Sequence, residues 1–240
     1  MRWAYGVTTV KERARTLLQM TLRSLETAGF PDPRLFVDDP GEIGTRGQEV
    51  TYRNPRIRTF GNWYLGLVEL LVRHPEADMY AMFQDDFVTY KNLRQYLERV
   101  PYPERSYCNL YTFPSNQSLA PDKVGWFEAR EMEDGCGEVF HGKRQQLGRG
   151  AVALVFSKEA AVTLLSSPHF VSKPLEAANP CRKVDGCIVT AMNKAGYREM
   201  VHNPSLVQHT GEVSMMENHP HLQATSFRGE DFDALDLLGC

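Results

Sequence analysis

The chain has 240 residues, of which 42% are hydrophobic and 24% are charged, and its formal net charge is -3. This composition is typical of a globular protein with a hydrophobic core and excludes a largely disordered chain. The acidic balance argues against a protein that binds nucleic acid through its overall charge. No segment has the roughly 18 consecutive apolar residues of a membrane-spanning helix, and the N-terminus lacks the pattern of a signal peptide. We therefore expect a cytoplasmic protein of bacterial or viral origin.

The five cysteines are an odd number and include no Cys-x-x-Cys pair. Free thiols in a reducing compartment are the simplest interpretation. A zinc site is the alternative, but its ligand spacing would match no common zinc motif. Its candidate ligands would be Cys136, His141, Cys181 and Cys187.

The first part of the chain predicts alternating strands and helices. Residues 3–10 are apolar and β-prone, residues 11–28 carry leucines at helical spacing, and residues 34–37 form a second apolar run. This order predicts parallel strands joined by a crossover helix. Residues 40–60 are rich in glycine, proline and arginine and predict a loop.

A helix capped by Asn62 is expected to run to residue 73, before a strand over residues 79–83. This strand is continuously apolar, which is typical of a central strand buried on both faces. The remaining chain predicts shorter elements and one long irregular stretch. They are a helix over 91–99, a strand over 109–113, a loop over 114–148, a strand over 150–156, a helix over 158–166 capped by Ser157, a helix over 184–195, a turn over 196–204, a strand over 205–208 and a polar tail.

The strongest local motif is Gln84-Asp85-Asp86, directly after the predicted central strand. Ligands of open α/β sheets bind at the carboxyl ends of the strands. Two adjacent carboxylates repel each other there unless a cation or protons intervene, and a divalent metal would supply that charge. An acidic turn that caps the next helix is the alternative interpretation.

Three further motifs are weaker when each is taken alone. His209 ends a short predicted strand and could bind a manganese-like ion, or could simply bond to nearby backbone. Asp185 opens a predicted helix and could be a general base or an N-terminal cap. Gly148-Arg149-Gly150-Ala151 precedes a strand and permits close approach of a ligand, or forms a plain turn.

The order of these features resembles that of GT-A glycosyltransferases over residues 3–211. The features are, in order, a strand ending in Thr8-Thr9-Val10, a strand ending in Asp38, a helix at Asn62, the acidic motif, the Gly150-Ala151 segment, Asp185 and His209. The resemblance implies an α/β fold with a Rossmann-like, mixed but mostly parallel sheet flanked by helices. It implies one domain over 1–211, with a nucleotide-sugar-binding half over 1–105 and an acceptor and catalytic half over 106–211. Residues 212–240 would be a C-terminal tail.

The resemblance also implies a UDP-sugar donor, a hydroxyl acceptor and a manganese or magnesium cofactor. Asp86 and His209 would bind the metal, and Asp185 would be the base of an inverting reaction. The usual family motif is Asp-x-Asp, and Gln84 in its first position removes one carboxylate. The residues implied to contact the donor are Thr8, Thr9, Val10, Arg15, Asp38, Arg58, Asn62, Gln84, Asp85, Gly150 and Ala151.

The acceptor is less defined. The small size is similar to that of phage-type enzymes that glycosylate hydroxymethylated pyrimidines, such as 5-hydroxymethylcytosine, in DNA, where the base must leave the stack. Basic residues would then contact phosphates. The candidates are Arg46, Arg53, Arg56, Arg58, Lys143, Arg144 and Arg149.

Four alternatives stay open. One is a glycosyltransferase that acts on a glycan, a lipid or a small molecule, and another is a degenerate GT-A domain that only binds nucleotide. A nucleotidyltransferase usually has a glycine-rich phosphate loop after the first strand, and residues 8–13 contain no glycine. A nuclease or phosphatase would need more acidic ligands than these motifs supply.

Overall fold

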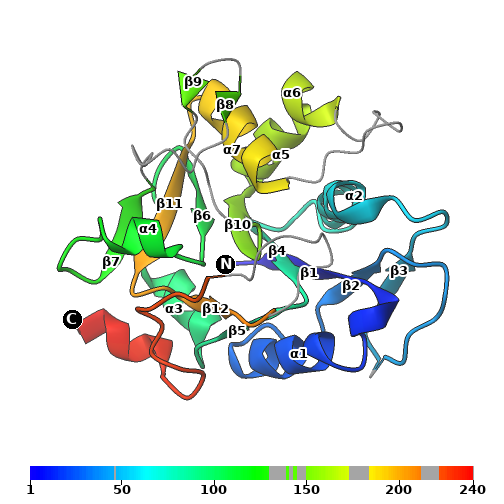
Figure 1. Ribbon diagram of the computed structural model, residues 1–240, viewed down its shortest axis with the longest axis horizontal. Coiled ribbons are helices and arrows are strands. Elements are labelled where there is room, and N and C mark those ends of the chain that lie inside the picture. The colour runs from blue at the N-terminus through cyan, green and yellow to red at the C-terminus, as the bar shows by residue number, and fades with distance from the viewer. Residues whose placement is uncertain are drawn as a thin grey trace.

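The computed structural model describes residues 1–45, 47–129, 139–140, 143–144, 150–172, 184–211 and 222–239. Its centre is an eight-stranded sheet with the strand order β3-β2-β1-β4-β10-β6-β11-β7 (Figure 1). The strands are β1 (Trp3–Thr9), β2 (Arg34–Val37), β3 (Val50–Tyr52), β4 (Met79–Gln84), β6 (Ser106–Asn109), β7 (Gly125–Glu128), β10 (Ala153–Ser157) and β11 (Arg198–Asn203).

The sheet is mixed and mostly parallel. Strand β1 runs parallel to β2 and β4, β2 runs parallel to β3, and β6 runs parallel to β11. Strand β10 lies antiparallel between β4 and β6, and β7 is antiparallel to β11. The predicted α/β class, with a mostly parallel sheet flanked by helices, is therefore confirmed.

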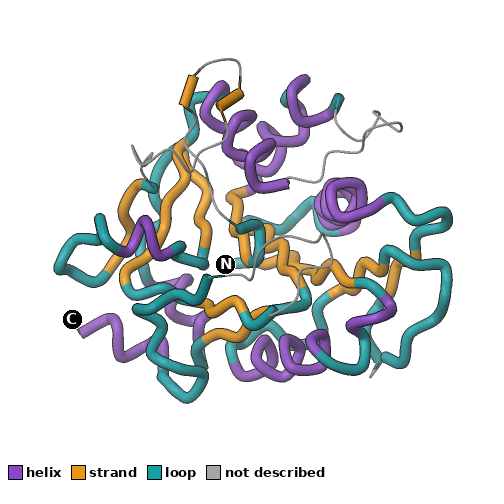
Figure 2. The backbone as a smooth tube through the Cα atoms, in the orientation of Figure 1, coloured by secondary structure: helices purple, strands orange, loops and turns teal. Residues whose placement is uncertain are grey.

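Helices cover both faces of this sheet (Figure 2). Helices α1 (Leu17–Thr27) and α3 (Leu93–Arg99) contribute to one hydrophobic cluster. Helices α2 (Arg58–Arg73), α5 (Lys158–Ser166) and α7 (Val184–Lys194) contribute to the other. Within the described ranges, none of the helices is long and apolar enough to cross a membrane.

The central strand β4 is apolar at nearly every position because both of its faces are buried. Met79, Ala81 and Phe83 belong to the first cluster, whereas Tyr80 and Met82 belong to the second. Successive side chains of a strand point to opposite faces, so a strand covered on both sides must be apolar at every position. The apolar run therefore ends only where the strand leaves the core, at Gln84.

Close packing between strands requires a glycine at residue 6, within β1. A Cβ atom added to Gly6 would lie 2.4 Å from a ring carbon of Phe36 and 2.9 Å from the carbonyl oxygen of Arg34. Contacts this short force the backbone to shift. Phe36 itself is fully buried on β2, beside β1, and packs in the cluster under α2.

A second, two-stranded sheet joins distant parts of the chain. Strand β5 (Phe87–Thr89) pairs antiparallel with β12 (Val207–His209), and His209 lies opposite Phe87. The backbone N–H of Thr210 donates to the carbonyl oxygen of Asp86 at 2.9 Å. This pairing places His209 near Asp86, two residues after the end of β4.

Several predicted boundaries are wrong. Residues 11–28 form the short 3-10 helix Lys11–Arg13 and then α1, because the chain turns between them at residues 14–16. Asn62 does not cap a helix but lies inside α2, where its side chain is buried. Residues 109–113 are not a strand, since β6 ends at Asn109. Strands β3 and β11 were not predicted because each has few apolar residues in an alternating pattern.

The end of the chain also differs from the predicted tail. Residues 222–239 pack on the domain, with Phe227 stacked on Tyr90 at 4.8 Å between ring centroids. The amide of Asn92 donates to a carboxylate oxygen of Asp233 at 2.7 Å. The remaining short elements are α4 (Pro114–Gln117), β8 (Val139–Phe140), β9 (Lys143–Arg144), α6 (Pro168–Val171) and the 3-10 helix Ala234–Gly239.

Candidate functional site

The candidate site lies at one edge of the sheet, where parallel strands end. Strand β1 ends at Thr9, and β4 ends beside it at Gln84. Strand β10 runs the opposite way and therefore starts at this edge, where the N–H of Gln84 donates to the carbonyl oxygen of Val152 at 2.8 Å. The edge thus gathers the acidic motif and the segment that leads into β10.

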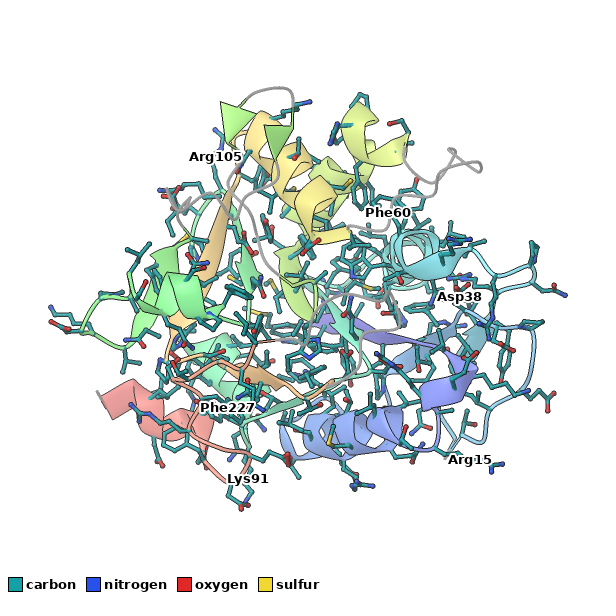
Figure 3. All side chains as sticks on the ribbon, in the orientation of Figure 1. Arg15, Asp38, Phe60, Lys91, Arg105 and Phe227 are labelled. Carbon is teal, nitrogen blue, oxygen red and sulfur yellow. The ribbon has the colours of Figure 1, made fainter. Side chains whose placement is uncertain are left out.

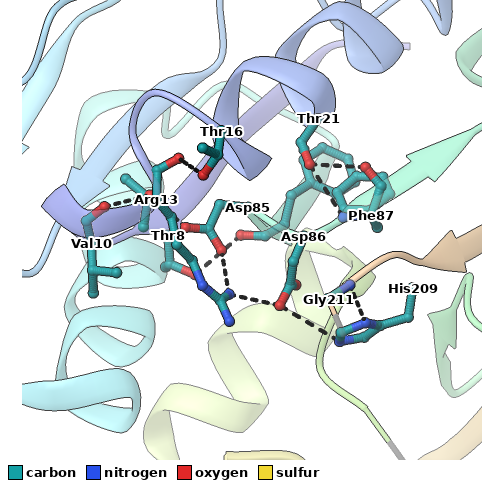
Figure 4. A network of polar contacts seen from close by, with 12 residues as sticks. Thr8, Val10, Arg13, Thr16, Thr21, Asp85, Asp86, Phe87, His209 and Gly211 are labelled. Carbon is teal, nitrogen blue, oxygen red and sulfur yellow. Dashed lines mark hydrogen bonds and ion pairs between the residues drawn. The ribbon is translucent and has the colours of Figure 1, made fainter. Parts of the chain in front are cut away.

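Arg13 connects the two carboxylates of the acidic motif (Figure 4). One terminal nitrogen of its guanidinium, Nη1, donates to Oδ1 of Asp85 at 2.8 Å and to Oδ2 of Asp86 at 2.7 Å. The hydroxyl of Thr9 donates to the second oxygen of Asp85 at 2.6 Å. Both oxygens of Asp85 are therefore bound within the protein, and Asp85 holds Arg13 in place.

Burial dominates the electrostatics of this cluster. The side chains of Asp85 and Asp86 are 4% and 3% exposed. Burial and the adjacent Asp86 raise the pKa of Asp85, whereas Arg13 and the Thr9 hydroxyl oppose the rise. Burial lowers the pKa of Arg13, but the two carboxylates outweigh it and leave that pKa above its usual value. A pair of buried carboxylates thus shares a single guanidinium.

His209 lies on the other side of Asp86. Its Nε2 atom is 3.7 Å from Oδ2 of Asp86, and its Nδ1 atom accepts a hydrogen bond of 3.1 Å from the N–H of Gly211. With Nδ1 as the acceptor of this bond, the hydrogen of the neutral imidazole is assigned to Nε2. Gly211 is needed here, because an added Cβ would lie 2.9 Å from both the Asp86 carboxylate and the His209 ring.

Asp86 and His209 carry the ligand types that divalent cations use. Oδ1 of Asp86 is buried and has no hydrogen-bond partner in the described part of the chain. A carboxylate oxygen and an imidazole suit manganese or magnesium-like ions, with further positions left for phosphate oxygens or water. The described residues contain no group of three or more His, Cys, Asp or Glu that could hold a metal. Binding through Nε2 of His209 would also require the ring hydrogen to move.

Asp185 lies in the first turn of α7 and contacts the segment that precedes β10. Its Oδ2 accepts the N–H of Gly150 at 3.1 Å, and its Oδ1 accepts the N–H of Gly186 at 2.9 Å. The side chain is only partly buried. Asp185 and Gly150 are therefore brought together, as the sequence predicted for one site, whereas the neighbouring Ala151 is buried in the core.

Some predicted donor contacts serve the framework. The hydroxyl of Thr8 donates to the carbonyl oxygen of Phe83 at 3.2 Å, and Oδ1 of Asp38 accepts the N–H of Ile57 at 2.7 Å. The amide of Asn62 donates to the carbonyl oxygen of Phe36 at 2.8 Å. All three residues are buried, so their hydrogen bonds stabilise the backbone around the site.

The remaining predicted donor residues are more accessible. Val10 and Gln84 are half-buried at the strand ends, and Arg58 is exposed at the start of α2. Arg15 is exposed near α1, whereas Asp38, directly after β2, is buried; both are labelled in Figure 3. Arg15 lines a surface cavity of about 500 Å³ between the start of α1 and residues 42–45.

Two of the arginines proposed to contact DNA form ion pairs within the protein. Arg53 is buried and forms an ion pair with Glu69, and Arg56 forms ion pairs with Asp39 and Glu12. The carboxylates already neutralise both charges, while the side chain of Arg56 stays 45% exposed. Arg46 and Arg149, and the side chains of Lys143 and Arg144, lie outside the described residues.

The cysteine predictions are tested only in part. Cys108 and Cys187 are buried and form no disulfide within the described residues, in agreement with the predicted thiols. The other proposed zinc ligands, Cys136, His141 and Cys181, lie outside the described residues, as does Cys240.

The sequence interpretation missed Arg13. It selected Arg15, two residues later, from the resemblance to the nucleotide-contacting region of GT-A enzymes. The position of Arg13 just after the first strand could have identified it. Because β1 and β4 are parallel neighbours, the first turn after β1 lies at the same sheet edge as Asp85 and Asp86. Buried carboxylates at this edge require a nearby cation, and Arg13 is the arginine in that turn.

Comparison with known proteins does not place the chain in a family. No protein-family model matches it, and no curated protein matches it at a significant level. The functional assignment therefore depends on the site geometry.

Proposed function

We propose that the chain is a GT-A glycosyltransferase that transfers a sugar from a nucleoside-diphosphate sugar to a hydroxyl acceptor. The observation that carries this proposal is the buried Asp85–Asp86 pair at the end of the central strand, where Oδ1 of Asp86 has no partner among the residues that the structure describes. His209 approaches from β12, and Asp185 faces the Gly150 segment at the same sheet edge. Charged groups at strand ends are suited to bind a phosphorylated ligand.

In this proposal, positive charge binds the diphosphate of the nucleotide-sugar donor. The diphosphate would meet Arg13 and a divalent cation bound by Asp86 and His209, and such a cation stabilises the leaving diphosphate. We propose manganese or magnesium for that cation. The nucleoside, which the resemblance implies is uridine, would occupy the cavity that Arg15 lines beside α1.

Asp185 is the proposed base. It would take the proton of the acceptor hydroxyl as that oxygen forms its bond to the anomeric carbon. The bond from this carbon to the diphosphate oxygen breaks in the same displacement, and the nucleoside diphosphate leaves with its electron pair. Attack from the opposite side inverts the configuration of the sugar.

The test is a release assay for nucleoside diphosphate over a panel of nucleotide sugars, with and without manganese. We expect slow hydrolysis of one donor, dependent on metal and faster with an acceptor. The acceptor panel should include simple sugars and DNA containing 5-hydroxymethylcytosine. If no donor is consumed and no donor raises the melting temperature, the proposal is wrong. Thermal stabilisation by a nucleotide without any turnover would instead support a domain that only binds nucleotide.

Replacing Asp185 with asparagine should lower the transfer rate about 100-fold or more, because the amide cannot accept the hydroxyl proton. Donor affinity should change little. The control is Glu159→Gln, because Glu159 is also an acidic residue in the first turn of a helix, α5, but is exposed and away from Gly150. Equal rates for the two variants, with both proteins folded, would remove Asp185 from the role of base. A product that retains the donor's configuration would do the same.

A further inference from the structure

A buried carboxyl group on β11 is connected to Asp185. Glu199, on β11, is 1% exposed and sits opposite Tyr107 of β6 in the parallel register. Its Oε1 accepts a hydrogen bond of 2.9 Å from the amide of Asn109. Its Oε2 is buried and has no partner of normal hydrogen-bond geometry among the described residues. A carboxyl group in such a place is costly and needs an explanation.

Hydrogen bonds connect Glu199 to the proposed base. The same amide nitrogen of Asn109 also donates to the carbonyl oxygen of Gly150 at 3.1 Å. The N–H of Gly150 in turn donates to Oδ2 of Asp185 at 3.1 Å. The side-chain carbonyl oxygen of Asn109 accepts a hydrogen bond of 3.1 Å from the N–H of Tyr111. Asn109 and Gly150 therefore form a continuous path between the two carboxyl groups.

The charge of Glu199 changes near neutral pH. Burial raises the pKa of Glu199 to about 7, the hydrogen bond from Asn109 opposes the rise, and the negative charge of Asp185 adds to it. The facing groups on the described neighbours are Tyr107 on β6 and Asp185 on α7. No ion pair between Glu199 and a Lys, Arg or His is formed within the described ranges.

We propose that Glu199 is a positioning residue that fixes Asn109 and Gly150 against Asp185 and strengthens Asp185 as a base when Glu199 is ionised. This inference rests on the role of Asp185 in the proposed function. A protonated Glu199 can still accept the hydrogen bond from Asn109, so the path persists while the charge changes. The ionised form places a second negative charge in a poorly solvated region, which favours uptake of the acceptor proton by Asp185.

The first test compares the pH dependence of the transfer rate in the wild type, Glu199→Gln and Glu128→Gln. Glutamine keeps an oxygen for Asn109 but cannot ionise, and Glu128 is an exposed residue on the adjacent strand β7. The wild-type rate should rise through pH 7. Glu199→Gln should lack this rise, match the wild type near pH 6 and be about 5-fold or more slower near pH 8. Glu128→Gln should follow the wild type. A folded Glu199→Gln with the wild-type profile would overturn the proposal.

The second test does not need activity. The Glu199 carboxyl is titrated by carbon-13 NMR in the wild-type chain and in Asp185→Asn, with the resonance assigned by its loss in Glu199→Gln or, if that variant does not fold, Glu199→Asp. The midpoint should move to lower pH when the charge of Asp185 is removed. An unchanged midpoint means that the two groups are not coupled and overturns the inference. A shifted midpoint in a protein that transfers no sugar would leave the coupling standing while the proposed function fails.

Discussion

Replacing Asp86 with alanine should lower the sugar-transfer rate by about 10³-fold, as expected when charge stabilisation of a leaving group is lost. Oδ2 of Asp86 binds Arg13 and lies 3.7 Å from Nε2 of His209, whereas its Oδ1 has no hydrogen-bond partner among the described residues. The variant should also lose any dependence of the rate on manganese. The measurement is the release of nucleoside diphosphate at saturating donor, with and without metal.

The matched control for Asp86 is Asp78→Ala. Asp78 precedes the same strand at the opposite edge of the sheet, its side chain is half-exposed, and its carboxylate contacts Arg2. This variant should keep wild-type activity. Asp86→Ala should still fold, because Arg13 retains Asp85 as a partner. A folded Asp86→Ala variant with a rate within about tenfold of the wild type would rule out a central role for this carboxylate.

Replacing Arg13 with methionine should lower the free energy of unfolding by about 3 kcal/mol at pH 8. The loss arises because two buried carboxylates are left without the guanidinium that they share. Thermal or urea unfolding measures it. The control is Arg15→Met, which removes an exposed arginine two positions later and should change stability by no more than about 0.5 kcal/mol.

The same variant makes a prediction about pH and metal. Burial and the adjacent Asp86 already raise the folded-state pKa of Asp85 above its unfolded value, and the loss of Arg13 removes a charge that opposes this rise. Protonation then favours the folded state, so the stability of Arg13→Met should increase as the pH falls from 8 to 5, relative to Arg15→Met. Manganese should also stabilise Arg13→Met more than Arg15→Met if the pair binds a cation. Identical stability curves for the two variants would show that Arg13 does not neutralise the pair.

Local sequence patterns were sufficient for the elements whose pattern is complete within a few residues. Strand β2 and helix α5, with its Ser157 cap, have the predicted bounds, and β4 differs from its prediction by one residue. The acidic motif was correctly placed at the end of β4, because an apolar strand must end where polar residues begin.

The contacts between site residues that are distant in the sequence could not be predicted from local patterns. His209 meets Asp86 only because β12 pairs with β5, more than 100 residues earlier in the chain. Short strands with few apolar residues carry little register information, so their partners are chosen by the surrounding fold. The path from Glu199 to Asp185 likewise requires β6, β11 and α7 to lie together.

The sequence by itself determined the α/β class, the buried central strand and the presence of two carboxylates at its end, because hydrophobic periodicity and strand length are local properties. Only the tertiary structure decided which cation the carboxylates meet, that Asn62 and Asp38 support the site from the interior, and that Glu199 is connected to Asp185. Those outcomes depend on burial and on distances between separate elements, and both are set when the whole chain packs.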